Sequence, residues 1–183
     1  MDASDSRTPE MSLEREFKST APFSYTDTGE REAARMLTRT LGNSVQFLFK
    51  RRVGTAKVDI IVIAASGVFV LDPKDYWGRK VRANRARDSF VVNGRARPGL
   101  ADSMRRHIEA VREAVDVGPM PDAPVSGAFC FMNADLPLGR LVVDDVPATT
   151  LHGVAKMLKR RGPLTADKRA KLHTYLSEQF PPA

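Results

Sequence analysis

The sequence contains one cysteine, few aromatic side chains and no long apolar run. Because Cys130 is alone, an intramolecular disulfide and a zinc site built on several cysteines are both excluded. The longest apolar stretch, residues 60–71, is interrupted by Ser66 and Gly67 and is well short of the ~20 residues that span a bilayer. Residues 1–5 (MDASD) lack the basic start and apolar core of a signal peptide. We therefore expect a cytoplasmic protein without membrane contact.

Three common catalytic or nucleotide-binding motifs are also missing. The sequence has no GxxxxGK[ST] phosphate loop, no GxGxxG and no GxSxG, so nucleotide-driven and serine-hydrolase functions have no support. Its three histidines, His107, His152 and His173, lie on separate expected helices without the spacing of metal ligands. Histidine-based metal binding is therefore not expected.

Positive charge is in excess, and it is unevenly distributed. The 183-residue chain has 29 lysines and arginines against 22 acidic residues, a formal net charge of +7. Residues 1–26 contain five acidic and three basic side chains, which leaves a net charge of +9 on the rest of the chain. A basic body favours a polyanionic partner, with nucleic acid ahead of an anionic membrane.

Apolar periodicity and turn signals predict one domain after a flexible acidic arm. Residues 1–26 have no periodicity and are expected to form the arm, and residues 27–183 to form the single domain. The expected order is one helix, three strands, short basic β segments, a helix, two strands and two C-terminal helices. We assign the helices to residues 27–41, 101–115, 151–161 and 166–179, and the strands to 45–49, 58–63, 68–74, 125–132 and 141–143. This order is typical of an α/β fold.

Two aspartates are expected to face each other across the hairpin formed by the second and third strands. If the chain reverses over residues 64–67, paired residue numbers sum to 131, so that Asp59 faces Asp72. Alternation then places both aspartates and Lys74 on one face, continuous with the apolar residues of that face. Opposed carboxylates with Cβ atoms roughly 5 Å apart destabilise a sheet unless another charge offsets them. Lys74 can do so, and a divalent cation can do so more effectively.

Magnesium fits this arrangement because it takes oxygen ligands, usually one or two carboxylates with water and substrate phosphate. Glu30 lies on the apolar stripe of the first helix and reaches the same region if that helix packs on the same sheet face. Simpler interpretations remain open. Asp72 and Lys74 also fit an exposed ion pair at a strand end, and Glu30 fits a helix start favoured by the macrodipole. Pro73 implies that strand pairing ends near Asp72.

The ordered set Asp59, then Asp72-x-Lys74 after a short hairpin, resembles the PD-(D/E)xK signature of a nuclease superfamily. More specific resemblance to its nuclease-related (NERD) branch comes from four segments: TGEREAA at residues 28–34, VDIIV at 58–62, GVFVLD-x-K at 67–74 and Y-x-G at 76–78. The sequence departs from the pattern in three places, with Val58 for the nominal proline, Ile60 where a histidine is frequent and His107 where a glutamine is common.

This resemblance implies a restriction-endonuclease-like mixed sheet flanked by helices, here with an extra basic β-hairpin and two C-terminal helices. It implies hydrolysis of DNA phosphodiester bonds with Mg²⁺ or Mn²⁺, RNA being the second choice of substrate. The implied site residues are Asp59 and Asp72 as metal ligands, Lys74 at the attacking water and Glu30 as an assisting carboxylate.

Residues 79–97 contain seven basic side chains and one acidic one, Asp88. They fit a phosphate-binding ribbon beside the site, or a charged sheet edge that prevents strand pairing. Next to them, Trp77 and Tyr76 fit either stacking on a base or pinning of the hairpin. The basic residues are Arg79, Lys80, Arg82, Arg85, Arg87, Arg95 and Arg97.

Two other functions remain open on the same fold. One is a nucleic-acid-binding module with little or no catalysis, and the other is a protein-interaction domain whose acidic arm covers the basic face. The intact set of Glu30, Asp59, Asp72 and Lys74 favours the nuclease over the binding module.

Overall fold

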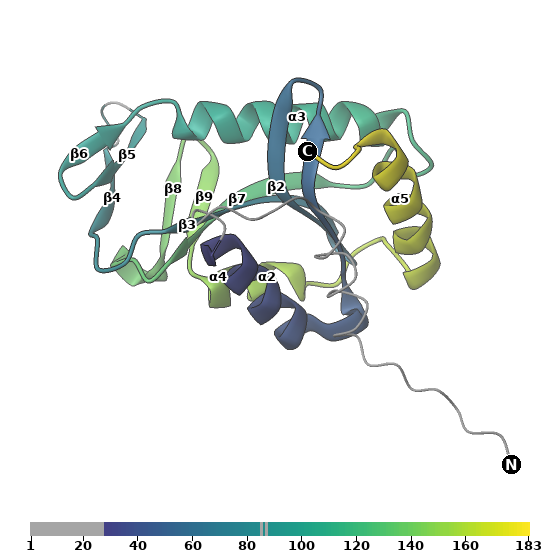
Figure 1. Cartoon of the computed structure of the whole chain (residues 1–183), viewed down its shortest axis with the longest axis horizontal. Coiled ribbons are helices and arrows are strands. Elements are labelled where there is room, and N and C mark those ends of the chain that lie inside the picture. The colour runs from purple at the N-terminus through teal and green to yellow at the C-terminus, as the bar shows by residue number, and fades with distance from the viewer. Residues whose placement is uncertain (1–27, 85, 87) are drawn as a thin grey trace, which may run out of the picture.

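A six-stranded mixed sheet separates two layers of helices (Figure 1). The computed structural model describes residues 28–183 other than Arg85 and Arg87, so the expected N-terminal arm lies outside the described residues. The strands lie in the order β1-β2-β3-β7-β9-β8, with the first three antiparallel and β7 parallel to both β3 and β9. They are β1 (Gln46–Val53), β2 (Ala56–Ala64), β3 (Gly67–Asp75), β7 (Val125–Met132), β8 (Arg140–Val143) and β9 (Val146–Thr149).

Each face of the sheet has its own layer of helices. Helices α2 (Thr28–Leu41) and α4 (Leu151–Leu158) cover one face, and α3 (Leu100–Asp116) and α5 (Ala166–Gln179) cover the other (Figure 1). Because both faces are covered, the central strands β2 and β3 are buried over most of their length. The chain also forms two short 3-10 helices, η2 (Gly42–Ser44) and η3 (Pro137–Gly139).

The apolar stripe predicted for the first helix forms its contact with the sheet. Ala33, Ala34, Leu37 and Leu41 recur at helical spacing and are all buried. They pack against side chains of β2, β3 and β7 that include Cys130, which is fully buried. Burial raises the pKa of the Cys130 thiol to about 12, so this cysteine is a core residue and stays neutral.

A second, three-stranded antiparallel sheet lies beside one end of the large sheet (Figure 1). Its strands are β4 (Val81–Asn84), β5 (Ser89–Val92) and β6 (Arg95–Arg97). It has one strand more than the expected hairpin, because Asn93 and Gly94 both take positive φ and reverse the chain tightly into β6. Phe90 anchors this sheet in the core, with its ring edge-on to Phe129 at a centroid distance of 5.5 Å.

The expected helices and strands are all present, and the structure adds elements at the edges. Strand β9 was not predicted, since four residues (VPAT) that include a proline have a weak strand pattern. The turn before it uses Asp144 and Asp145, both with positive φ. None of the helices in the described part of the chain is both long and apolar enough to cross a membrane.

The β2–β3 hairpin has the predicted register. The pairs run from Ala64 opposite Gly67 to Ile60 opposite Leu71, and their residue numbers sum to 131 as expected. Gly67 has φ of 142°, and a Cβ placed there would lie 2.3 Å from the carbonyl oxygen of Pro124. The hairpin turn therefore requires glycine for both backbone conformation and space.

Replacing Gly67 with alanine is expected to destabilise the fold by roughly 2–4 kcal/mol, because a backbone clash adds to the conformational strain. Gly54 is the matched control. It lies in the turn between β1 and β2 with φ of 59°, and a Cβ placed there would meet nothing within 4 Å. Gly54→Ala should cost only about 1 kcal/mol. The measurement is the urea unfolding midpoint of both variants. Equal decreases in stability would show that the close approach of the Pro124 carbonyl does not add to the cost of the Gly67 substitution.

Candidate functional site

The two aspartates lie where the antiparallel ladder between β2 and β3 ends. The last pair is Ile60 with Leu71, and Asp59 and Asp72 are the next residues along the two strands. Beyond that point β3 still pairs with β7 as far as Asp75, and Pro73 lies opposite Cys130 of β7. Pairing with β2 ends before Pro73, as predicted, while pairing with β7 continues past it.

The side-chain alternation of β2 breaks at Asp59. Val58 packs in the same core as Ile61, three residues away, whereas a regular strand would place them on opposite faces. Strand β1 is irregular at the same level, because Lys50 has φ of 48° and the β1–β2 register passes over it. The alternation of β2 is therefore interrupted between Ile60 and Val58, at the level where β1 is also distorted.

Asp72 forms an ion pair with Lys74 in a partly buried setting. The Lys74 Nζ to Asp72 Oδ1 distance is 2.8 Å, with side-chain exposures of 33% and 17%. The pair is thus not the exposed strand-end ion pair that the sequence also allowed. Burial raises the pKa of Asp72 above its ordinary value, even though the positive charge of Lys74 acts in the opposite direction.

Asp59 joins this pair as a second carboxyl group. Burial raises its pKa, and the negative charge of Asp72 raises it further. The two carboxyl groups lie close enough together for each to act on the pKa of the other. The structure therefore brings together Asp59, Asp72 and Lys74, and the two carboxyl groups hold protons more readily than ordinary aspartates.

The Lys74 amine remains charged in this setting. Burial by itself lowers its pKa, but the ion pair with Asp72 and the charge of Asp59 outweigh burial and leave the pKa raised. The amine is therefore an ammonium at neutral pH.

Glu30 reaches the site from the opposite side of the sheet. The prediction required its helix to pack on the face of Ile61 and Val70, but α2 packs on the other face, so this condition is wrong. Glu30 nevertheless raises the pKa of Asp72 through its charge, and it forms an ion pair with Lys50. Glu30 thus acts on the site although its helix packs on the opposite face of the sheet.

Two residues near the site were not predicted to belong to it. One is Lys50, whose positive charge opposes the rise in the pKa of Asp59 that burial causes. Extending the β1–β2 register, which places residue 50 opposite residue 59, would have found it. His107 of α3 has a pKa lowered by burial, while the charge of Asp59 acts to raise it. The helical spacing of His107 from the buried Met104 and Val111 was the available signal that it faces inward.

Among the described residues, no group of three or more histidine, cysteine, aspartate and glutamate side chains is arranged to hold a metal ion. Asp59 and Asp72 supply the two carboxyl groups of the expected site, and both are oxygen donors.

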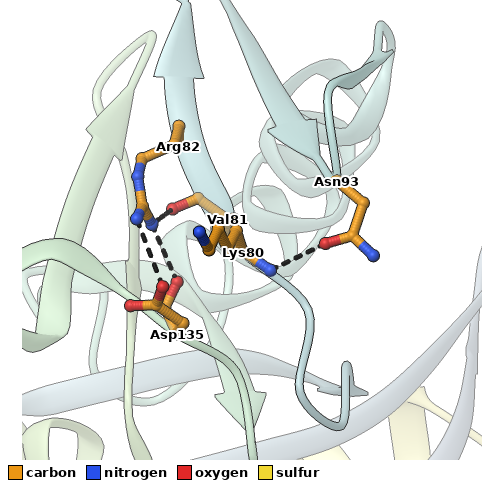
Figure 2. Close-up of polar contacts among 5 residues, drawn as sticks. All are labelled: Lys80, Val81, Arg82, Asn93 and Asp135. Carbon is orange, nitrogen blue, oxygen red and sulfur yellow. Dashed lines mark hydrogen bonds and ion pairs between the residues drawn. The ribbon is translucent and has the colours of Figure 1, made fainter.

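Five of the seven predicted basic residues are described, and they lie on or beside the small sheet in two groups. Arg79, Lys80, Arg95 and Arg97 are exposed on or beside β4 and β6. Arg82 instead donates hydrogen bonds to the backbone oxygen of Asp135, at 3.0 Å, and to its carboxylate, at 3.2 Å (Figure 2). Arg85 and Arg87, also predicted to bind nucleic acid, lie outside the described residues.

Arg82 therefore ties the small sheet to the chain that follows β7. The backbone reinforces this connection, because Val81 N donates to the Asp135 carbonyl and Asp135 N donates to the Arg79 carbonyl, both at 2.9 Å. Asn93 closes the other side, where its side-chain oxygen accepts from Lys80 N at 2.8 Å (Figure 2). The small sheet is thus a fixed part of the molecule.

A cleft opens between α2, α4 and the carboxyl end of β7. Met36 and Leu37 of α2 and Leu151 and His152 of α4 line it, with Asn133 after β7. It was not predicted, because its walls come from helices more than a hundred residues apart in the chain.

Comparison with known proteins gave one match. The family model of the nuclease-related domain, NERD, matches residues 26–132, whereas neither a curated protein nor a solved structure matched the chain. The matched residues are more than half of the chain and include the site and the small sheet. The mixed sheet flanked by helices also agrees with the expected nuclease-like fold. The chain therefore belongs to the nuclease-related domain family.

Proposed function

We propose that this protein hydrolyses phosphodiester bonds of DNA with Mg²⁺ or Mn²⁺ as cofactor. The observation that carries the proposal is the pairing of two partly buried carboxyl groups, Asp59 and Asp72, with one ammonium group, Lys74, where the central ladder ends. Membership of a nuclease-related family supports the same class of chemistry.

The donor set suits a hard divalent cation. Asp59 and Asp72 offer carboxylate oxygens, and Mg²⁺ usually binds one or two carboxylates and completes its shell with water and phosphate oxygens. The pKa of each carboxyl group is raised mainly by burial, which disfavours the charged carboxylate, and a bound cation would favour that charged form. When bound, the ion would polarise the phosphoryl group and lower the pKa of a coordinated water.

Each side chain then has a defined role. Asp59 and Asp72 would hold the cation, and Lys74 would stand beside the attacking water and the phosphate. As an ammonium, Lys74 stabilises the negative charge that develops when the water oxygen bonds to phosphorus and the P–O bond breaks. Glu30 assists from α2 by holding Lys50 in its ion pair, close enough for the Lys50 charge to act on Asp59.

The small basic sheet would bind the DNA backbone. Arg79, Lys80, Arg95 and Arg97 are exposed on a sheet that Arg82 and Phe90 hold in place. Phosphate contacts of this kind position DNA without reading its sequence. An acidic macromolecule other than DNA would meet the same charges, so RNA remains the second choice.

A nucleic-acid-binding module without catalysis is the second candidate. It is favoured by one observation: Asp72 is already paired with Lys74, and the described residues offer no third metal ligand of the usual types. A protein-interaction domain is a third candidate, and an absence of any thermal shift with Mg²⁺ or Mn²⁺ would favour it over the metal-dependent one.

Asp72→Asn is expected to abolish metal-dependent cleavage, by at least about a hundredfold, because it removes a metal ligand and nearby charge. Without metal, the variant should be as stable as the wild type or more stable by up to about 1 kcal/mol, since the repulsion between two like charges is removed. A carboxyl group whose pKa is raised by folding stabilises the fold at low pH and loses that contribution as the pH rises. In chelator, the free energy of unfolding of the wild type should therefore decrease as the pH rises from acidic to neutral. The decrease should be smaller in the variant, which has one such carboxyl group fewer.

The measurements are plasmid and oligonucleotide cleavage with Mg²⁺, Mn²⁺ or chelator, and urea unfolding at several pH values. Asp75→Asn is the matched control, because Asp75 is exposed at the end of the same strand and should leave cleavage unchanged. Full activity in Asp72→Asn would place the cleavage elsewhere.

Lys74→Ala is expected to reduce cleavage by about 10²- to 10⁴-fold while the metal still binds. Removing the ammonium leaves both carboxylates available, so the thermal shift produced by Mn²⁺ should persist or increase. Lys57→Ala is the control, because Lys57 is exposed on β2. If Lys74→Ala loses both cleavage and the thermal shift produced by Mn²⁺, Lys74 is needed for metal binding. That result would contradict a role for Lys74 in catalysis alone.

Replacing Arg79, Lys80, Arg95 and Arg97 together with alanine is expected to weaken DNA binding and to flatten its dependence on salt. The slope of log affinity against log salt should fall in magnitude by about 0.9 for each phosphate that the variant no longer neutralises. Arg82 is kept, because it holds the sheet in place. Binding is measured by fluorescence anisotropy in chelator at several salt concentrations.

The control for this variant replaces four exposed basic residues at the end of α4 and on α5: Lys159, Arg160, Lys168 and Lys171. It removes the same charge and should leave the slope close to the wild-type value. Equal slopes in both variants would mean that the small sheet carries only a solvated charged edge.

A further inference from the structure

Trp77 is a large apolar side chain left in solvent beside the site. Its side chain is 77% exposed, although it is the sole tryptophan of the chain and follows Lys74 by three residues. The sequence allowed this residue to pin the hairpin, and its exposure excludes that role. Tyr76 does the packing instead, with its ring 5.2 Å from the ring of Phe131.

A tight turn holds Trp77 in place. Arg79 N donates to the Tyr76 carbonyl at 2.9 Å, which closes a β-turn with Trp77 and Gly78 at its corners and with φ of 63° at the glycine. Tyr76 N donates to the Met132 carbonyl and Gly78 N to the Asn133 carbonyl, at 3.1 and 2.9 Å. The backbone on both sides of Trp77 is therefore fixed to the chain after β7, so that binding has to order only the indole side chain.

The surroundings of the turn are basic. Arg79 and Lys80 follow Trp77 directly and are exposed, and the Arg79 guanidinium lies 5.9 Å from the centre of the Tyr76 ring. Lys74 lies on the other side, three residues back along β3. At 3.3–3.6 Å per residue, the backbone from Lys74 to Trp77 extends at most about 10 Å, so the indole and the ammonium group lie within reach of neighbouring nucleotides of one strand.

We propose that Trp77 stacks on an unpaired base of single-stranded DNA, close along the strand to the phosphate at Lys74, and so directs the site to single strands. This inference rests on the proposed function, since Lys74 marks where the substrate phosphate lies. A fixed aromatic face between cationic side chains is the usual platform for single-stranded nucleic acid. In a duplex the faces of internal bases are covered by their neighbours, and the indole has no free face to meet.

The test uses intrinsic fluorescence, because Trp77 alone supplies the tryptophan signal. Wild-type protein in chelator is titrated with a single-stranded DNA oligonucleotide and with the corresponding hairpin duplex whose end is capped by a loop of abasic sites. Stacking predicts quenching by the single strand and little quenching by the duplex. A set of oligonucleotides with one abasic position each should show loss of quenching at one or two adjacent positions.

Affinities of variants are measured by anisotropy of labelled DNA in chelator. Trp77→Ala should bind the single strand roughly ten- to a hundredfold more weakly and the duplex as the wild type does, whereas Trp77→Phe should retain most of the affinity. Val117→Ala is the control, because Val117 is 80% exposed at the far end of α3 from the small sheet. It should change neither affinity.

The outcomes separate this inference from the proposed cleavage, since every measurement is made without metal. Quenching that is equal for single strand and duplex, or absent for both, overturns the stacking proposal even if the protein cleaves DNA. Equal single-strand affinity in Trp77→Ala and wild type overturns it as well. Specific quenching with no cleavage under any metal upholds the stacking and removes only the catalytic proposal.

Discussion

The antiparallel pairing of β2 with β3 is the constraint on which the candidate site depends. The pairs from Ala64 with Gly67 to Ile60 with Leu71 leave Asp59 and Asp72 as the next two residues, at the point where the strands separate. A shift of one residue would move one carboxyl group to the other face of the sheet. Since both faces are packed with apolar side chains, such a shift would exchange the side chains that meet each helix layer and disrupt the packing of both cores. The packing of the sheet thus enforces the meeting of the two carboxyl groups.

That meeting leaves a charge imbalance which the fold only partly relieves. Lys74 pairs with Asp72, and Lys50 acts on Asp59 from β1, yet both aspartates keep raised pKa values because they are partly buried. Buried charges in proteins are usually paired and fully hydrogen-bonded. A partly compensated carboxyl pair at the end of a buried strand is the electrostatic condition that a divalent cation would complete.

The three-stranded sheet supplies exposed positive charges near the carboxyl pair. Phe90 anchors it in the core and Arg82 ties it to Asp135, so its exposed cations occupy fixed positions. The turn that carries Trp77 is held between this sheet and the chain after β7. A rigid arrangement of cations and one aromatic face, beside a carboxyl pair, would orient a polyanionic strand with little loss of entropy.

Much of this protein was determined by the sequence alone, because its signals are local. The period of two in β2 and β3 and the short turn at Gly67 specify the register, and with it the meeting of Asp59 and Asp72. The helical period of α2 likewise predicts its buried stripe.

Tertiary structure decided the rest, since it depends on which elements pack together. Helix α2 lies on the face opposite to that of Ile61 and Val70, so Glu30 approaches through Lys50 rather than from the expected side. The break in alternation at Asp59 follows from the distortion of β1, which no pattern within β2 reveals. The sequence also did not determine whether Trp77 is packed or exposed to solvent. For a residue in a loop, that depends on neighbours distant in the chain, and here the loop is held by Met132 and Asn133.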